Sequence, residues 1–198
     1  AYEFAGMFVE AFATAHRQNY GACKGGIADV LLGATYGICK VNGVERVGHV
    51  RDKMADMINL TETLYAGSIA CSYEGRPTPS GAWRADTMLA NITKHNTTKF
   101  VYEIDRIAHD LVGGLLATLP AEADLRNPAG NESMCTEDKI RLYRLVETLS
   151  GGTAVVESMH GAGSPQSQRI MMLRDAKLEE KLKLAQKLVD CEGACCGQ

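Results

Sequence analysis

The sequence lacks several features that would assign it to a specialised class of protein. No apolar run approaches the length of about 20 residues that a membrane-spanning helix needs, so we expect no membrane partner. The sequence also shows no secretion signal, in which a basic segment is followed by an apolar segment and then by small residues at a cleavage site. Basic residues are not in excess, because 21 lysines and arginines stand against 24 aspartates and glutamates. Since nucleic-acid binders are usually basic, we also expect no nucleic-acid partner.

A disulfide framework is not indicated either, although the chain contains 7 cysteines. Their number is odd, and a chain of 198 residues with 5 prolines is longer and poorer in turns than a secreted disulfide scaffold. We therefore expect reduced thiols and a cytoplasmic location. The sequence begins with alanine in an already helical pattern, which suggests a fragment, a processed chain or one part of a larger protein.

Apolar residues recur at helical spacing along almost the whole chain. The pattern predicts an all-α fold: an antiparallel four-helix bundle with shorter C-terminal helices and no strand. Residues 1–190 would form this bundle as one domain, and residues 191–198 would form a flexible tail. The helices are predicted at 3–17, 24–40, 44–73, 83–118, 136–149, 153–159 and 167–190, the last with a break near Asp175.

The stretch HRQNYGAC concentrates reactive side chains in one helical segment. His16 and Cys23 lie on one helix face, separated by about 10.5 Å along a straight axis. Spacing alone leaves three interpretations open. The pair could bind different irons of an iron–sulfur cluster, the helix could break at 19–21 with Gly21 as the hinge, or the two could be a core histidine and a buried core cysteine.

A second cluster lies in VVESMHGAGSPQSQR. Glu157 follows two valines, so it is either a partly buried general base or an exposed glutamate at a helix end. Residues 161–164 precede a helix start, where backbone N–H groups bind phosphate, or they form an ordinary turn. The spacing of Cys191 and Cys195 would suit a metal clip, but two ligands on a flexible end make a poor site.

Four stretches together resemble one enzyme family over nearly the whole chain. They are HRQNYGACKGG, TKFVYEIDRIAHDLVGGLLATLP, TEDKIRLYRLVETLSGGTA and ESMHGAGSPQSQRIM. They are similar to the C-terminal portion of the 4-hydroxybutyryl-CoA dehydratases, which group with the 4-hydroxyphenylacetate 3-hydroxylases and have a helical half like that of acyl-CoA dehydrogenases. The resemblance implies FAD, a [4Fe-4S] cluster, an acyl-CoA substrate and a homotetramer built as a dimer of dimers.

The resemblance also implies roles for individual residues. His16 and Cys23 would bind the cluster, and an N-terminal half, covalently joined or separate, would supply two further cysteines. Tyr20 and Lys24 would orient the substrate, and Glu157 would be a base. His16 would also be catalytic, by moving protons. Seven residues would contact FAD, which in such enzymes is usually the FAD of a neighbouring subunit. They are Arg17, Gln18, His160, Gly161, Ala162, Gly163 and Ser164.

The implied activity is a hydro-lyase reaction, the dehydration of 4-hydroxybutyryl-CoA to crotonyl-CoA, together with vinylacetyl-CoA isomerisation. The C3–H bond is too weakly acidic for an ordinary base, which implies a flavin-dependent radical route with the cluster as Lewis acid on the C4 hydroxyl. Three alternatives are a reduced-flavin monooxygenase, a non-catalytic helical oligomerisation subunit and an isomerase of another acyl-CoA. The monooxygenase would have no use for Cys23. The polar loop at about 127–135 is shorter than usual for the family, which would affect subunit contacts or the mouth of the site.

Overall fold

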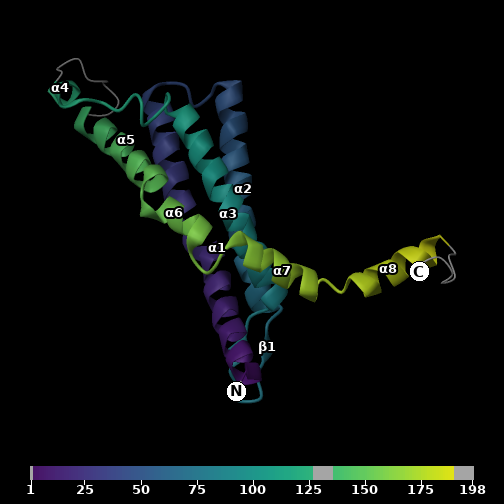
Figure 1. Ribbon diagram of the computed structural model, residues 1–198. Coiled ribbons are helices and arrows are strands. Elements are labelled where there is room, and N and C mark those ends of the chain that lie inside the picture. Colours follow the sequence, from purple (N-terminus) through teal and green to yellow (C-terminus); the bar gives the residue numbers. More distant parts are fainter. Residues whose placement is uncertain (1, 127–135, 190–198) are drawn as a thin grey trace.

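The chain folds as a bundle of long helices in a computed structural model that describes residues 2–126 and 136–189 (Figure 1). Three long helices run side by side and pack pairwise, and a fourth lies against the first of them. The predicted all-α antiparallel four-helix bundle is therefore confirmed. In chain order these helices are α1 (Tyr2–Val41), α2 (Gly48–Tyr73), α3 (Thr87–Leu111) and α5 (Thr136–Gly151).

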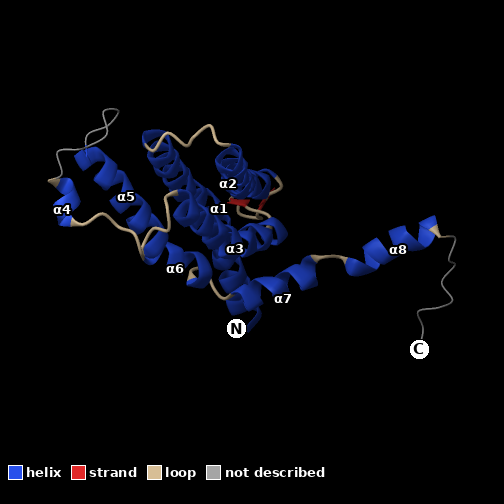
Figure 2. Ribbon diagram, turned by 90° about the horizontal axis from the view of Figure 1, so that it is seen from above, coloured by secondary structure: helices blue, strands red, loops and turns tan. Residues whose placement is uncertain are grey.

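Shorter elements complete the described chain. They are β1 (Arg76–Pro77), β2 (Trp83–Arg84), α4 (Glu122–Leu125), α6 (Thr153–His160), α7 (Pro165–Asp175) and α8 (Leu178–Leu188). β1 and β2 form a short antiparallel pair between α2 and α3, where the sequence predicted no strand. α6 packs on α3 and α5, and α7 packs on α3. α8 projects away from the bundle and buries none of its residues (Figure 2).

α1 is one uninterrupted helix of 40 residues, so the break considered at residues 19–21 is wrong. Gly21 serves helix packing instead of bending. A Cβ on Gly21 would collide with Ser68 Oγ and Thr93 Cγ2, and it would lie 2.9 Å from the Leu64 carbonyl oxygen. α1, α2 and α3 therefore approach one another at a distance that only glycine permits.

Two other helix ends have a conformational cause. α3 ends at Leu111 rather than near residue 118, because Gly113 and Gly114 adopt φ angles of +90° and +83°. The predicted break near Asp175 is confirmed: Lys177, with a φ of +49°, separates α7 from α8. Left-handed residues thus set both boundaries.

The interior of the bundle changes character along its length. Toward the α1–α2 turn the buried side chains are mainly apolar, as at Leu31, Ile38, Met57, Ile107 and Val112. Toward the β1–β2 end they are largely polar or charged, and include Thr14, Arg17, Lys24, Ser68, Asn91, Lys94 and Thr97. Charged side chains are rarely buried without a specific partner. The polar half is also the half that contains the predicted site residues.

Within the described residues, no helix combines the length and the apolar character that crossing a bilayer requires. Two predictions fall outside the described residues, namely the shortened loop at 127–135 and the tail at 191–198 with its cysteine spacing. Both stay predictions.

Candidate active site

Three reactive residues of HRQNYGAC, namely His16, Tyr20 and Cys23, lie on the outward face of α1. Phe12, His16 and Tyr20 are stacked along it, with successive ring centroids 5.7 Å and 5.3 Å apart. His16 is exposed, and so is Cys23 two turns further on. The interpretation as a core histidine and a buried core cysteine is therefore wrong. Both donor groups are accessible from outside this chain.

His16 and Cys23 cannot both coordinate a single metal ion. Because α1 is unbroken, their seven-residue spacing corresponds to about 10.5 Å along the axis. No group of three His, Cys, Asp or Glu side chains in the described chain could hold a metal ion. An imidazole nitrogen and a thiolate are, however, suitable ligands for different irons of one cluster. The donor atoms of these two residues are thus compatible with an iron–sulfur cluster, which would need further ligands from outside the described residues.

A charged pair joins α6 to α1 beside this face. Lys24 Nζ donates to Glu157 Oε2 at 3.0 Å, with the Lys24 side chain 3% exposed and the Glu157 side chain 61% exposed. Glu157 is therefore the exposed glutamate of our two interpretations, and the partly buried alternative is wrong. Its role as a base stays a prediction. Lys24 Nζ also lies 5.6 Å from the Tyr20 ring centroid, so the tertiary fold brings Tyr20, Lys24 and Glu157 together.

Gly161 faces Tyr20 across the contact between α1 and α6. A Cβ on Gly161 would collide with the Tyr20 hydroxyl oxygen and lie 2.5 Å from Tyr20 Cζ. The glycine therefore makes room for the phenol. Burial, followed by the negative charges of Glu157 and Cys23, raises the pKa of Tyr20. The phenol thus keeps its proton at neutral pH and can donate a hydrogen bond.

Lys94 is a buried member of this cluster that the sequence analysis missed. Its Nζ donates to the Ser158 carbonyl oxygen at 2.6 Å and lies 4.8 Å from the Tyr20 ring centroid. Burial, followed by the charges of Arg17 and Lys24, lowers the pKa of Lys94 to about 8. A sequence signal did exist, because Lys94 occupies a buried stripe of α3 at helical spacing with Ala90, Thr97, Val101, Ile104 and Ala108.

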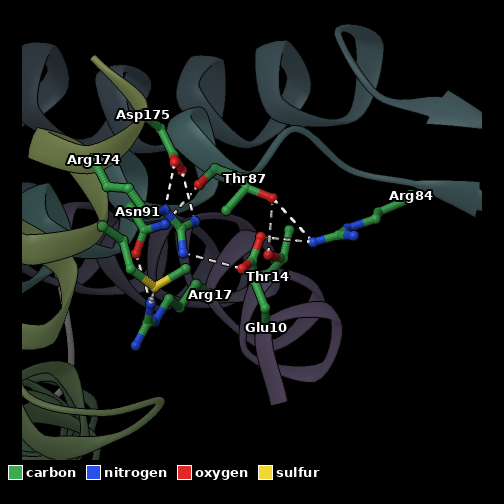
Figure 3. Close-up of polar contacts among 9 residues, drawn as sticks. Glu10, Thr14, Arg17, Arg84, Thr87, Asn91, Arg174 and Asp175 are labelled. Carbon is green, nitrogen blue, oxygen red and sulfur yellow. Dashed lines mark hydrogen bonds and ion pairs between the residues drawn. The ribbon is translucent and has the colours of Figure 1, made fainter. Parts of the chain in front are cut away.

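Arg17 points into the bundle rather than outward (Figure 3). Its guanidinium donates to protein acceptors, namely Asn91 Oδ1 at 2.6 Å, Met171 Sδ at 2.8 Å, Ser167 Oγ at 2.9 Å and the Ala162 carbonyl oxygen at 3.0 Å. These contacts tie α1 to α3, to α7 and to the loop before α7. These bonds use four of the five N–H groups of a guanidinium, and Arg17 is buried, so the geometry favours a structural role for Arg17.

Ion pairs continue this network toward β2 (Figure 3). Arg84 and Arg174 each reach the Glu10 carboxylate at 3.1 Å, and Arg174 also pairs with Asp175 at 2.7 Å. All four side chains are partly exposed, so each pair contributes little to stability. Together they orient the start of α1 relative to α7 and β2.

The loop before α7 has the form of a helix start. Ser164 caps α7 by accepting a hydrogen bond from the Ser167 N–H at 3.4 Å, and Pro165 follows at the first position of the helix. Ala162 and Gly163 adopt φ angles of +58° and +91°. Gly163 and Ser164 are exposed, so this backbone is of a kind that binds phosphate.

The two remaining predicted FAD contacts lie in different surroundings. His160 is exposed at the C-terminal end of α6, next to the loop. Gln18 instead donates to Ser72 Oγ at 2.7 Å, in the contact between α1 and α2. The structure thus brings His160 and the loop together and leaves Gln18 apart from them.

A small cavity of about 10 Å³ lies behind the charged cluster. Lys24, Asp105 and Ser158 contribute to its lining, together with apolar side chains of α1, α3, α5 and α6. Such a volume accommodates about one water molecule at most. Asp105 Oδ2 has no hydrogen-bond partner in the described chain, and burial raises the pKa of this carboxyl to about 7. Asp105 is thus a poorly solvated acid within the bundle.

Sequence comparison matches nearly the whole chain to known proteins. The family model described as 4-hydroxyphenylacetate 3-hydroxylase C terminal (HpaB) matches residues 5–190. A curated relative, the 4-hydroxybutyryl-CoA dehydratase/vinylacetyl-CoA-Delta-isomerase of Clostridium aminobutyricum, is 43% identical over 209 residues. That match covers 94% of this chain but 43% of the relative, so this chain spans less than half of the relative's length.

Solved structures share the fold. An oxygen-tolerant archaeal 4-hydroxybutyryl-CoA dehydratase from N. maritimus has a TM-score of 0.90 at 42% identity, over 98% of this chain and 41% of that chain. The oxygenase component (HpaB) of 4-hydroxyphenylacetate 3-monooxygenase, complexed with FAD and 4-hydroxyphenylacetate, has a TM-score of 0.73 at 20% identity, over 87% of this chain and 40% of that chain. At that identity the likeness shows the fold alone. The chain belongs to the 4-hydroxyphenylacetate 3-hydroxylase C-terminal family, in which it is similar to the 4-hydroxybutyryl-CoA dehydratases, as its motifs predicted.

Proposed function

We propose that this chain is the C-terminal portion of an enzyme that dehydrates 4-hydroxybutyryl-CoA to crotonyl-CoA and isomerises vinylacetyl-CoA. The observation that carries the proposal is the exposed face of α1, where His16, Tyr20 and Cys23 lie beside the ion pair of Lys24 with Glu157. The name of the relative that is 43% identical states both activities. The rest of the enzyme would correspond to the part of the relatives that this chain does not match.

A [4Fe-4S] cluster and FAD belong to this proposal. His16 and Cys23 would hold the cluster, which their donor atoms and their exposure support. The exposed loop at residues 161–164 would contact FAD, which its position before α7 supports. When bound, the flavin supplies one-electron chemistry that acidifies the C3–H bond, and the cluster supplies Lewis acidity at the C4 hydroxyl.

The residues of this chain would bind, orient and move protons. The exposed carboxylate of Glu157, held by Lys24, would accept the proton from C3 of the substrate. Tyr20, whose raised pKa keeps its phenol protonated, would orient the acyl group by a hydrogen bond. The exposed imidazole of His16 would pass a proton to the departing hydroxyl. We also propose a homotetramer and a cytoplasmic location.

A reduced-flavin monooxygenase acting on phenols is the second candidate. The fold likeness to the HpaB oxygenase favours it, because that protein was solved with FAD and 4-hydroxyphenylacetate. The exposed thiol of Cys23 argues against this candidate, because a flavin monooxygenase reaction does not need a thiol at this position. The assembly of Tyr20, Lys24 and Glu157 at one point likewise argues against a purely structural subunit.

The test compares cysteine variants of the full-length holoenzyme. Cys23→Ala should lower iron content and dehydration of 4-hydroxybutyryl-CoA together. Cys39→Ala is the matched control, because it removes a buried thiol from the apolar half and should change neither. Full dehydration activity in an iron-free Cys23→Ala enzyme would contradict the proposal. Hydroxylation of 4-hydroxyphenylacetate, without dehydration, by the unmodified enzyme would favour the second candidate.

A further inference from the structure

Lys94 is a charged side chain to which the proposed reaction assigns no task. It is fully buried on the inner face of α3, where most of the other buried residues are uncharged and Asp105 is the exception. Burying an ammonium group costs several kcal/mol in desolvation, whereas an apolar side chain of similar length would cost nothing of that kind. A lysine at this position therefore needs a specific interaction that a methionine could not make.

The contacts of Lys94 are with the two elements that carry the candidate site. Its Nζ donates at 2.6 Å to the carbonyl oxygen of Ser158, the residue that follows Glu157 on α6. The same nitrogen lies 4.8 Å from the Tyr20 ring centroid on α1, within range of a cation–π interaction. One buried ammonium thus touches the backbone next to the proposed base and the ring of the proposed orienting residue.

Other links between these elements are weaker or act differently. The pair of Lys24 with Glu157 leaves the glutamate side chain 61% exposed, so solvent screens it. Gly161 only makes room for the Tyr20 hydroxyl and holds nothing in place. A charge-assisted hydrogen bond in a dry interior is stronger than an exposed ion pair. The buried Arg17 of α1 binds the Ala162 carbonyl oxygen, but this lies in the loop after α6. Lys94 is therefore the buried charged contact that reaches α6 itself and the Tyr20 ring of α1.

We propose that Lys94 is a positioning residue, whose ammonium holds the Ser158 carbonyl and the Tyr20 ring so that Glu157 and Tyr20 keep the separation that the reaction needs. The part concerning the reaction rests on the proposed function. The part concerning position rests on the contacts alone. Because Lys94 is fully buried within this chain, it acts through Glu157 and Tyr20.

This role depends on the charge of Lys94, which gives it a pH signature. Burial lowers the pKa of Lys94 to about 8, so the ammonium is present below that pH and is lost as the pH rises through it. The neutral amine loses the cation–π interaction and the charge assistance of its hydrogen bond. The titratable and charged groups around it are Arg17, Tyr20 and Lys24 on α1, His95 on α3 and Glu157, next to Ser158, on α6. Arg169 on α7 acts on His95.

The test uses three variants of the full-length holoenzyme. Lys94→Met removes the charge and the donor, Lys94→Gln keeps a donor without a charge, and Lys99→Met removes an exposed lysine from the same helix as the control. Lys94→Met should lower kcat by about 100-fold, the effect of a displacement of about 1 Å, with KM nearly unchanged. Lys94→Gln should recover part of the loss. The kcat of the unmodified enzyme should decline as the pH rises through about 8, and this decline should disappear in both Lys94 variants and persist in Lys99→Met.

Hydrogen exchange gives a readout that needs no substrate. Amide exchange in residues 153–160 should be faster in Lys94→Met than in the unmodified protein, and unchanged in Lys99→Met. If the unmodified enzyme does not dehydrate 4-hydroxybutyryl-CoA, the proposed function is wrong. The comparison of hydrogen-exchange rates then still tests whether Lys94 positions α6. Normal kcat in Lys94→Met, or the same decline at pH 8 in Lys94→Gln, overturns the inference. If Lys94→Met does not fold, the dependence of kcat on pH in Lys94→Gln is sufficient to test the inference.

Discussion

The two halves of the bundle interior bury different kinds of side chain. Next to the α1–α2 turn the core is made of residues such as Leu31, Ile38 and Met57, each almost completely excluded from solvent. In the other half α1 and α3 bury charged groups, including Lys24 and Lys94. Apolar burial stabilises a fold, whereas charged burial costs stability unless each group is paired. The apolar half therefore holds the bundle together, and the polar half holds the candidate site.

Close helix packing lets the buried polar side chains of the polar half find partners. A Cβ on Gly67 would lie 2.7 Å from Thr93 Oγ1, and one on Gly21 would collide with the same threonine. Helices this near to each other leave little room for water between them. Side chains such as Lys94 can then reach partners on a neighbouring helix directly, as its hydrogen bond to Ser158 shows.

The largest loss of stability is expected from a cavity in the apolar half. Ile38→Ala should lower the free energy of unfolding by about 2–5 kcal/mol, since a fully buried isoleucine leaves a cavity. Urea unfolding would measure this loss. The kcat of enzyme that remains folded should not change. A lower kcat at a temperature where the protein is fully folded would show that the halves are not separate in function.

A glycine pair on α1 tests the close packing of the polar half. Gly21→Ala should lower the free energy of unfolding by about 3 kcal/mol, because the new methyl meets side chains and a backbone carbonyl that cannot yield. Gly26→Ala is its control. No atom lies within 4 Å of a Cβ on Gly26, so that change should stabilise the helix by about 0.5–1 kcal/mol. Equal effects in thermal unfolding would contradict the packing role of Gly21.

Asp105 is a buried ionisable residue at the edge of the apolar half, so the stability of the protein should depend on pH. Burial raises the pKa of Asp105 to about 7 from its ordinary value of 3.8. The folded state then binds this proton more tightly than the unfolded state, so stability falls as pH rises from about 4 to 7 and then levels off. Asp105→Asn should increase the free energy of unfolding on the order of 2 kcal/mol at pH 8 and change it little at pH 4. An unchanged pH profile in urea unfolding would contradict this.

The smallest effect is expected from charges outside both halves. Arg141 pairs with Glu137 and Asp138 on the exposed face of α5. Arg141→Ala should change the free energy of unfolding by less than about 0.5 kcal/mol, because solvent and salt screen such pairs. A loss as large as that of Ile38→Ala would mean that surface charge, not the apolar core, stabilises the bundle.

Much of the fold could be predicted from local patterns. The helical spacing of apolar residues predicted the four-helix bundle, and the pattern near Asp175 predicted the break that separates α7 from α8. The seven-residue spacing also placed His16 and Cys23 on one face, and α1 keeps that face. Helix ends at Gly113 and Gly114 were missed, because the sequence does not reveal which glycine adopts a left-handed conformation.

The candidate site was predictable in part, through motifs rather than spacing. Lys24 and Glu157 stand 133 positions apart, and nothing local indicates that they form an ion pair. The family resemblance named both residues, but it did not indicate Lys94. The stripe on α3 showed that position 94 faces inward, while its partners on α1 and α6 depend on how three helices pack.

The sequence by itself determined the helices and the family, because hydrophobic periodicity and motifs are local properties. Only the tertiary structure decided that Gly21 is a packing contact rather than a hinge, and that Glu157 is exposed while Lys94 is buried. Burial and charge pairing arise between helices that are distant in the chain. Those contacts exist only once the helices have packed, so no short stretch of sequence contains them.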